Sequence, residues 1–350
     1  MILRIFNPSH DECLASGSPY YTPSRTARQM DEVHLPGWHC LSDDLPSWQD
    51  VERIEPWGWD ARITHQLRRR GCPERLLPSA ERLDTIRRLS SRQTAVRLLP
   101  MVTDKFKSCW WEAPAKSPSL DHSLSPSGLA TPPCHPSPVR EGDNTLQEML
   151  SSLAKVSSPS LTGEGWQSSE GSFDGERLEV FGGGRLLFKS PWSCSGRGVF
   201  TYDEQRIQKV MREQGGIEVE PFYPRVADFA MEFRCQGGEV EFLGLSAMLN
   251  GGASTHAAGY GGNIVASDTT IRELMTRYVP EKDVNEARDK LLNVLRREIA
   301  PHYDGPLGID QMIVSLTPDD NAPSAYALHP LVEINLRHTM GLVAIEMRTT

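Results

Sequence analysis

Residues 331–341 read LVEINLRHTMG and residues 188–199 read FKSPWSCSGRGV. These two stretches carry the patterns that best indicate the fold class. In the first stretch, Glu333 and Asn335 alternate with the apolar Val332, Ile334 and Leu336. A strand places every second side chain on the same face, so the two oxygen-bearing side chains share one face. Carboxylate and amide oxygens are the ligands that Mg²⁺ prefers. The stretch therefore predicts a strand that carries a divalent-cation site.

Two further residues extend this prediction. Arg337 continues the alternation onto the same face, and Asp310 lies in the preceding predicted strand, GIDQMIV. Asp310 supplies a third oxygen ligand if the two strands pair. The alternative is a solvent-facing strand with incidental polar residues. Against it, the apolar frame of LVEINL makes uncompensated inward charges costly.

The second stretch predicts a phosphate-binding loop. Lys189 ends a predicted strand and precedes a turn rich in serine and glycine. Glycine lets backbone N–H groups approach phosphate oxygens, serine hydroxyls add donors, and Lys189 and Arg197 add positive charge. An ordinary hairpin loop would show the same glycines, and the GxxxxGK[ST] spacing of a Walker A loop is missing. The position of Lys189, seven residues before Gly196, favours nucleotide binding.

A third stretch, IEVEPFYPRVADFAMEF at 217–233, carries four carboxylates. Glu218 and Glu220 lie where a predicted strand ends at Pro221, as in a connection between two subdomains. Asp228 and Glu232 are four apart on the next predicted strand, which places them on one face. Ordinary edge-strand carboxylates remain the alternative, more so for Glu218 than for Glu220.

The remaining chain alternates strand and helix patterns, interrupted by a Ser/Pro-rich segment at 116–143 that cannot bury enough apolar surface to fold by itself. The expected strands are 2–6, one within 50–59, 177–180, 185–189, 217–222, 230–235, 240–249, 308–316 and 326–335. The expected helices are 24–32, 60–70, two from Ser79 onward, a short one at 145–155, 203–214, 269–277 and 281–300.

Composition excludes several classes of protein. The net charge of −9 over 350 residues argues against a nucleic-acid-binding face, which needs clustered Lys and Arg. No apolar run approaches the roughly 20 residues of a membrane helix. Seven cysteines, an odd number with no CxxC pair, argue against a disulfide framework and a structural zinc site. A reducing, cytoplasmic location is expected, and the oligomeric state stays open, with a homodimer among the options.

The order of a Lys-bearing strand, an SGRG loop, a VEP hinge, an Asp-bearing strand and an ExNxR strand closely resembles the ATP-grasp superfamily. The resemblance runs from about Ser79 to the C-terminus, apart from the Ser/Pro-rich insertion. The stretches FNPSHDECLAS and EPWGWD resemble the first domain of a group of largely uncharacterised bacterial ATP-grasp proteins. The implied fold class is α/β, an ATP-grasp fold of two α+β subdomains preceded by a small α/β domain. The implied units are an N-terminal pre-ATP-grasp domain at 1–78, a first lobe at 79–218 with an insertion at about 113–175, and a second lobe with the metal site at 219–350.

The resemblance also implies roles for individual residues. Lys189 would contact the α- or β-phosphate and the adenine edge, and Glu220 would lie at the hinge beside adenine and ribose. Arg92 stands where most members have an earlier lysine, as in a subset that uses arginine there. The nucleotide-binding set is Arg92, Lys189, Ser193, Ser195, Gly196, Arg197, Glu220 and Asp228; the Mg²⁺ ligands are Asp310, Glu333 and Asn335; the catalytic set is Lys189, Arg197 and Arg337.

The implied reaction is ATP-dependent ligation with Mg²⁺, or Mn²⁺ in its place. A small-molecule or peptide carboxylate attacks the γ-phosphate, and an amine or thiol displaces phosphate from the acyl phosphate. A kinase-like phosphoryl transfer and a non-catalytic nucleotide-binding module are the alternatives. The acceptor could face the Gly-rich loop at 254–263, or this loop could be only a connection. His10 and Asp11, just after the first strand, lie where ligands often bind at a sheet end.

Overall fold

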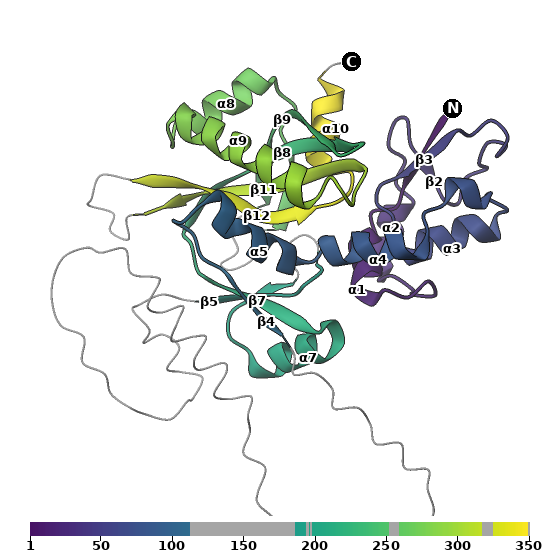
Figure 1. Cartoon of the computed structure of the whole chain (residues 1–350), viewed down its shortest axis with the longest axis horizontal. Helices are drawn as coiled ribbons and strands as arrows, with labels where there is room; N and C mark the ends of the chain where they lie inside the picture. Colours follow the sequence, from purple (N-terminus) through teal and green to yellow (C-terminus); the bar gives the residue numbers. More distant parts are fainter. Residues whose placement is uncertain (113–185, 194–195, 197, 252–258, 317–324, 349–350) are drawn as a thin grey trace, which may run out of the picture.

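The computed structural model describes residues 1–112, 186–193, 196, 198–251, 259–316 and 325–348, which form three sheets with their covering helices (Figure 1). The mixed α/β class expected from the sequence is confirmed. Several predictions lie outside the described residues: the Ser/Pro-rich insertion, the helix at 145–155, the strand at 177–180 and the first half of the loop at 254–263.

The N-terminal part is built on a parallel sheet of order β2-β1-β3. Its core is apolar, with Leu3, Ile5, Ile63 and Leu67 all fully buried. The Asp60 side chain caps α3 by accepting a hydrogen bond from the N–H of Ile63, as N-cap residues do. The elements are β1 (Ile2–Phe6), α1 (His10–Ser16), α2 (Arg25–Asp31), β2 (His39–Cys40), β3 (Arg53–Pro56), α3 (Ala61–Arg69) and the 3-10 turn η1 (Glu74–Leu76).

Two consecutive helices, α4 (Ala80–Leu89) and α5 (Arg92–Val102), lead from this part into the other two sheets. Ser79 and Ser91 cap them through their side-chain oxygens. Helix α5 contacts β12 of the larger sheet and β4 and β7 of the smaller one. It therefore lies between the two sheets, as Figure 1 shows.

The smaller sheet is antiparallel, with strand order β4-β7-β5-β6 and helix α7 on one face. Alternation along the strands turns Phe188, Ile217 and Val219 toward α7, where they are buried. Gly215 ends α7 in the left-handed conformation, with φ of 82°, which glycine adopts at little cost. The elements are β4 (Cys109–Glu112), β5 (Leu186–Lys189), β6 (Val199–Phe200), α7 (Glu204–Gln214) and β7 (Gly216–Pro221).

The larger sheet is antiparallel, with strand order β10-β9-β8-β11-β12. Met231, Phe233 and Ile309 share one face and belong to the same buried cluster as the apolar side of α9. The opposite face carries Glu232 and Asp310, because side chains alternate along each strand. The elements are β8 (Arg225–Gln236), β9 (Glu239–Gly251), β10 (Gly259–Asn263), α8 (Asp268–Thr276), α9 (Glu281–Glu298), β11 (Gly305–Ser315), β12 (Tyr326–Asn335) and α10 (Met340–Met347).

The N-terminal part packs on the end of the larger sheet through aromatic side chains. Phe6, Trp38 and Trp57 form a buried cluster with Val343 of α10. The main-chain N–H of His338 donates to the carbonyl of Trp57 at 2.8 Å. This contact joins the end of β3 to the short segment between β12 and α10.

The structure adds elements that the sequence patterns did not predict, among them α1, β4, β10 and α10. The expected boundary at 218 falls inside β7, and a division that keeps this strand whole falls after Pro221. Within the part of the chain that the structure describes, no helix is both long and apolar enough to cross a membrane.

Candidate active site

Lys189 lies at the centre of a buried ion cluster on the smaller sheet. Its Nζ lies 2.7 Å from Glu220 and 3.5 Å from Glu218, and all three side chains are buried. The two glutamates face the lysine together because they are two residues apart on β7. Burial acts to lower the pKa of Lys189, but the charges of Glu218 and Glu220 outweigh it and raise the pKa. The lysine is therefore held charged.

The loop after Lys189 folds back as a tight hairpin. The N–H of Ser190 donates to the carbonyl of Gly198, and Gly196 has φ of +74°. A Cβ added at Gly198 would collide with Ser193, so only glycine fits there. The glycines thus shape a close-packed turn next to Lys189, which is what both the hairpin and the phosphate-loop interpretations expect.

Arg92 joins this loop to the larger sheet. Its main-chain N–H donates to Pro191, and its guanidinium donates to Ser193 at 3.3 Å and to Glu333 at 2.9 Å. Burial acts to lower the pKa of Arg92, but Glu333 and the carboxylates beyond it raise the pKa overall. Its Nε is buried without a hydrogen-bond partner among the described groups. A buried donor without an acceptor is costly unless a ligand supplies one.

The larger sheet presents carboxylates to the same place. In the antiparallel pairing of β11 with β12, Asp310 lies opposite Glu333 and Gly308 lies opposite Asn335. The strand pairing on which the third oxygen depended is therefore present. The side chain of Asn335 hydrogen-bonds the Asp310 carboxylate, and Glu333 is held by Arg92.

Among the described residues, a direct ion-pair partner is present for Glu333, namely Arg92, and not for Asp310. Burial, followed by the charges of Glu333 and Glu232, raises the pKa of Asp310 to about 8. Burial also raises the pKa of Glu333, although the charge of Arg92 opposes the shift. Two facing carboxylates with such pKa values fit a site completed by a cation. Because Asp310, Glu333 and Asn335 offer only oxygen, the donor set suits Mg²⁺ rather than a softer metal.

Arg337 departs from the sequence prediction. Strand β12 ends at Asn335, so Arg337 does not continue the strand face as the alternation predicted. It lies in a bend, where its Nε and terminal NH₂ donate to the two carboxylate oxygens of Asp11 at 3.1 and 3.0 Å. Burial acts to lower the pKa of Arg337, but Asp11, Glu333 and Asp310 raise it overall. The guanidinium is therefore charged and oriented by the N-terminal part.

Glu232 is a further acid on the same sheet face. Its carboxylate accepts hydrogen bonds from Thr339 at 2.8 Å and Ser246 at 3.3 Å and is 1% exposed. Burial raises its pKa to about 7, although both hydroxyl donors oppose the shift. It belongs to the acidic environment of Asp310.

A cleft opens beside these residues, between α1 and the loop after β5. It encloses about 500 Å³ and adjoins a smaller pocket formed by Glu333, Asn335 and Arg337. Both hollows share Asp11, Trp192 and Ser193 in their walls. The cleft is lined by Asp11, Glu12, Ala15, Ser16, Tyr21, Ser190, Trp192, Ser193, Gly198, Glu213 and Gln214.

The structure brings most of the sequence-predicted residues together. The residues that meet around the Arg92 bridge are Arg92, Lys189, Ser193, Glu220, Asp310, Glu333, Asn335 and Arg337. Gly196 forms the turn of the hairpin, and Ser195 and Arg197 lie outside the described residues. Asp228 is on β8, where its carboxylate pairs with Arg225 at 2.9 Å. The ion-pair partner of Asp228 is therefore a neighbour on its own strand.

Sequence reasoning gave too little weight to two residues. For Glu218 the sequence left an ordinary edge-strand carboxylate as an equal alternative, yet the side chain is 2% exposed and faces Lys189. Its two-residue spacing from Glu220 was the available signal. Asp11 was placed near a ligand only by analogy with sheet ends, and no local pattern could link it to Arg337, 326 residues away.

No family model matches this chain, and no curated protein matches it. Among solved structures, the chain is similar to D-cycloserine synthetase, with 9% identity and a TM-score of 0.45 over 100% of this chain and 98% of that one. It is also similar to N5-carboxyaminoimidazole synthetase from Staphylococcus aureus complexed with ADP, with 12% identity and a TM-score of 0.44 over 99% and 73%. D-alanyl-alanine synthetase A from Vibrio cholerae is similar at 10% identity, with a TM-score of 0.41 over 84% of this chain and 70% of that one.

Proposed function

We propose that this protein is an ATP-dependent ligase of the ATP-grasp type that activates a carboxylate for attack by an amine or a thiol. The observation that carries the proposal is the Arg92 bridge. One guanidinium contacts both Ser193, in the loop after Lys189, and Glu333, in the acidic pair of the larger sheet. A cationic loop and an oxygen-donor site thus face each other across the distance of one side chain. A triphosphate with its metal ion needs this combination of charges.

We assign the phosphates of ATP to the cationic side. Lys189 and Arg92 supply positive charge, and the hairpin containing Ser193 and Gly196 supplies hydrogen-bond donors. The unpartnered Nε of Arg92 gives a phosphate oxygen a donor that is already in place. Glu218 and Glu220 keep Lys189 charged, and we infer that Glu220 acts on the nucleotide through this lysine.

We assign Mg²⁺ to Asp310, Glu333 and Asn335. When bound there, the ion would neutralise phosphate charge and would complete the charge balance of the two carboxylates. The protein itself positions all three ligands. Glu333 is held by Arg92, the side chains of Asp310 and Asn335 are hydrogen-bonded to each other, and the backbone of Asn335 is fixed opposite Gly308 at the end of β12.

We assign the carboxylate substrate to the cleft beside Arg337. A carboxylate oxygen attacks the γ-phosphorus and the bond to ADP breaks, which gives an acyl phosphate. The incoming amine or thiol then attacks the acyl carbon, loses its proton and displaces free inorganic phosphate. Arg337, held by Asp11 at the wall shared by both hollows, stabilises the negative charge of the transferred phosphoryl group. Catalysis here relies on positioning and charge neutralisation.

The test has two stages with separate readouts. Calorimetric titration of the full chain with ATP and Mg²⁺ should show binding that disappears without the metal; absence of binding would refute the nucleotide assignment. ADP and free phosphate are then measured with amino acids, short peptides and other carboxylates, with and without amines or thiols. A ligase releases phosphate in step with ADP, whereas phosphate retained on the product would overturn ligation in favour of phosphoryl transfer.

We also propose an N-terminal domain at 1–78 and two lobes that grip the nucleotide at 79–221 and 222–350, with the boundary placed after β7 so that this strand stays whole, and the cytoplasm as the compartment. All five cysteines in the described ranges are free thiols, which is consistent with a reducing environment.

A further inference from the structure

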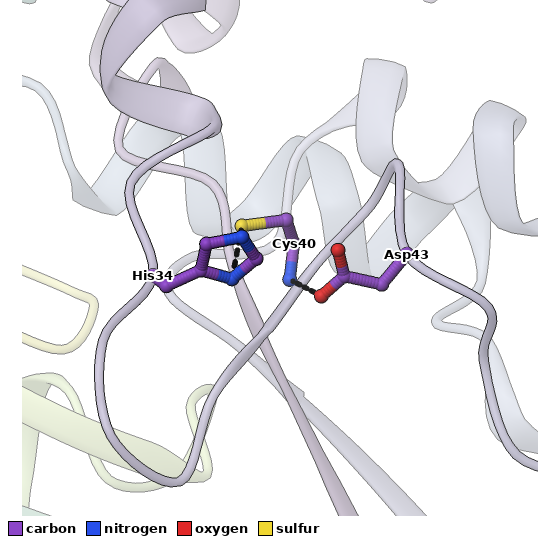
Figure 2. Close-up of side chains that lie close together, drawn as sticks. All are labelled: His34, Cys40 and Asp43. Atoms are coloured by element: carbon purple, nitrogen blue, oxygen red, sulfur yellow. Dashed lines mark hydrogen bonds between the residues drawn. The ribbon is translucent and has the colours of Figure 1, made fainter.

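The segment between α2 and β3 brings three metal-ligand side chains together. His34, Cys40 and Asp43 lie within a stretch of ten residues whose only regular structure is the two-residue strand β2. Their ligand atoms all lie within 4.8 Å of one another. Figure 2 shows the imidazole of His34 and the carboxylate of Asp43 turned toward Cys40 from either side.

The spacing of the sulfur and the imidazole nitrogen matches a tetrahedral site. Cys40 Sγ lies 3.6 Å from His34 Nδ1. Two ligands at zinc–sulfur and zinc–nitrogen lengths of about 2.3 and 2.1 Å, separated by a tetrahedral angle, would lie about 3.6 Å apart. A thiol hydrogen bond to the imidazole would have a similar length. The third ligand, Asp43, distinguishes a metal site from such a simple pair.

The surroundings hold the ligands in place and favour a cation. Asp43 accepts a hydrogen bond from the main-chain N–H of Cys40 at 2.8 Å through one oxygen, which leaves the other available. Arg70 anchors the segment by donating to the main-chain oxygen of Asp43. Asp31 and Glu32 add negative charge near Cys40. His34 is exposed while Cys40 is buried, so an ion can enter from solvent and still be partly enclosed.

We propose that His34, Cys40 and Asp43 bind Zn²⁺ with three protein ligands and a water molecule in the fourth position. Sulfur and imidazole ligands select zinc over Mg²⁺, whose site uses oxygen only. A thiolate, a carboxylate and a neutral imidazole carry two negative charges, which balance the ion. Binding replaces the thiol proton with the metal and releases that proton to solvent. The ion would pin the α2–β2 segment to the carboxyl edge of the parallel sheet, independently of the proposed ATP site.

The test uses cobalt(II) as a spectroscopic probe of the full-length protein, freed of metal by a chelator and kept in excess Mg²⁺ to occupy oxygen-only sites. We expect one equivalent of Co²⁺ to produce a thiolate-to-cobalt charge-transfer band in the near ultraviolet and visible bands of a tetrahedral ion. Zn²⁺ should displace the cobalt and abolish both signals. Cys40→Ser should remove the charge-transfer band, because Cys40 is the one cysteine of the cluster among the residues that the structure describes.

The other ligands are tested by affinity. Loss of a partner that only orients a metal ligand costs about 10–100-fold in metal affinity, so His34→Gln, which removes a ligand, should weaken binding at least about tenfold. Because His34 is exposed, this variant should keep the fold, and circular dichroism can verify that. Asp43→Asn keeps an oxygen acceptor for the Cys40 N–H and should weaken binding by removing the charged ligand.

Two variants serve as matched controls. His39→Gln changes the neighbouring histidine of β2, and Cys72→Ser changes another buried cysteine of the same sheet unit; both should keep the cobalt spectrum and its affinity. The absence of a charge-transfer band in the unaltered protein would overturn the proposal. So would a band that persists in Cys40→Ser, or an affinity unchanged in folded His34→Gln.

Discussion

Two pairs of carboxylates face the same site from different sheets, and they differ in how their charge is balanced. Glu218 and Glu220 on β7 share Lys189, whose Nζ lies 3.5 and 2.7 Å from them. Across the site, Asp310 faces Glu333, and within the described part of the chain only Glu333 has a direct ion-pair partner, Arg92 at 2.9 Å. The first pair carries its counter-ion on its own sheet, whereas the pKa of Asp310 is raised to about 8.

This difference in charge compensation indicates which pair of carboxylates can bind an added cation. Buried carboxylates must be paired, protonated or bound to a metal ion, because an isolated buried charge is very costly. The pair on the smaller sheet is already paired and serves to hold a lysine. The pair on the larger sheet is short of positive charge, and this is the condition that favours Mg²⁺ binding there. Removing the charge of Lys189 on the smaller sheet should therefore lower the stability of the fold. Removing the charge of Asp310 on the larger sheet should raise it when no metal is bound.

Glu333→Gln should have the largest effect, because it removes the charge of a metal ligand, while the amide oxygen that replaces it can still accept the hydrogen bond from Arg92 and hold the fold. We expect the rate of ADP production to fall at least about 100-fold, while the melting temperature changes little. The ADP-release assay measures the first quantity and calorimetric unfolding the second. Glu239→Gln, on an exposed strand end, is the control and should keep full activity. Undiminished ADP production by Glu333→Gln would refute the metal assignment.

Lys189→Met tests the smaller sheet and should destabilise the fold. Removing one partner of a buried ion pair leaves the other uncompensated, so we expect a loss of about 3–5 kcal/mol in the free energy of unfolding, measured by urea titration. Adding Glu220→Gln should recover part of the loss. Lys209→Met on the exposed side of α7 is the control. Equal stability of Lys189→Met and the unaltered protein would show that Glu218 and Glu220 do not depend on this lysine.

Asp310→Asn tests the larger sheet. In contrast to Lys189→Met, it should stabilise the fold when no metal is present. Burial and the charges of Glu333 and Glu232 raise the pKa of Asp310 from 3.8 to about 8. At pH values between these two, Asp310 is protonated in the folded state and ionised in the unfolded state. The free energy of unfolding should therefore fall progressively as pH rises from about 4 to about 8, because the folded state must give up this proton. In EDTA at pH above 8, Asp310→Asn should therefore melt at a higher temperature than the unaltered protein.

Mg²⁺ should reverse that ranking. When Mg²⁺ is added to the unaltered protein above pH 8, the melting temperature should rise. At a Mg²⁺ concentration of 100 times the dissociation constant, binding adds about 2.7 kcal/mol to the free energy of unfolding. Asp310→Asn should gain less. A melting temperature of the metal-free protein that rises steadily between pH 5 and 8, and is unaffected by the substitution, would contradict an under-compensated acidic pair.

Asp11→Asn should have the smallest of these effects. It keeps the shape of the side chain but turns the two-point ion pair with Arg337 into a neutral contact. Hydrogen bonds to charged groups are worth about 1.5–3 kcal/mol, so we expect a fall of about tenfold or more in kcat with little change in the KM for ATP. Asp50→Asn in the same N-terminal part is the control. A raised KM with unchanged kcat would place Arg337 in ground-state binding instead.

Local periodicity sufficed to predict the strands that carry the site. The alternation in LVEINL placed Glu333 and Asn335 on one face, and the apolar run around Asp310 identified the neighbouring strand. Lys189 was correctly expected at a strand end before a glycine-rich turn. These features depend on side chains only two to seven residues apart, which a strand or a turn places without help from the rest of the chain.

Long-range pairing could not be predicted in the same way. Arg337 was expected to extend the strand face, but the strand ends at Asn335 and Asp11 draws the guanidinium toward the N-terminal part. The cysteine spacing argued against a structural zinc site, because it contains no CxxC pair. His34, Cys40 and Asp43 meet only because the α2–β2 segment turns back on itself, and irregular loops leave no periodic signal.

Sequence patterns alone identified the strands that carry Lys189, Asp310 and Glu333, and placed Glu333 and Asn335 on one face, since these features follow from a repeat of two residues along the backbone. Only the tertiary structure decided which charges meet: Arg92 with Glu333 across 241 positions, Asp11 with Arg337 across 326, and Lys189 with Glu220 on adjacent strands. The physical reason is that charge compensation depends on distance in space. Packing of the three sheets sets that distance, and no spacing along the chain records it.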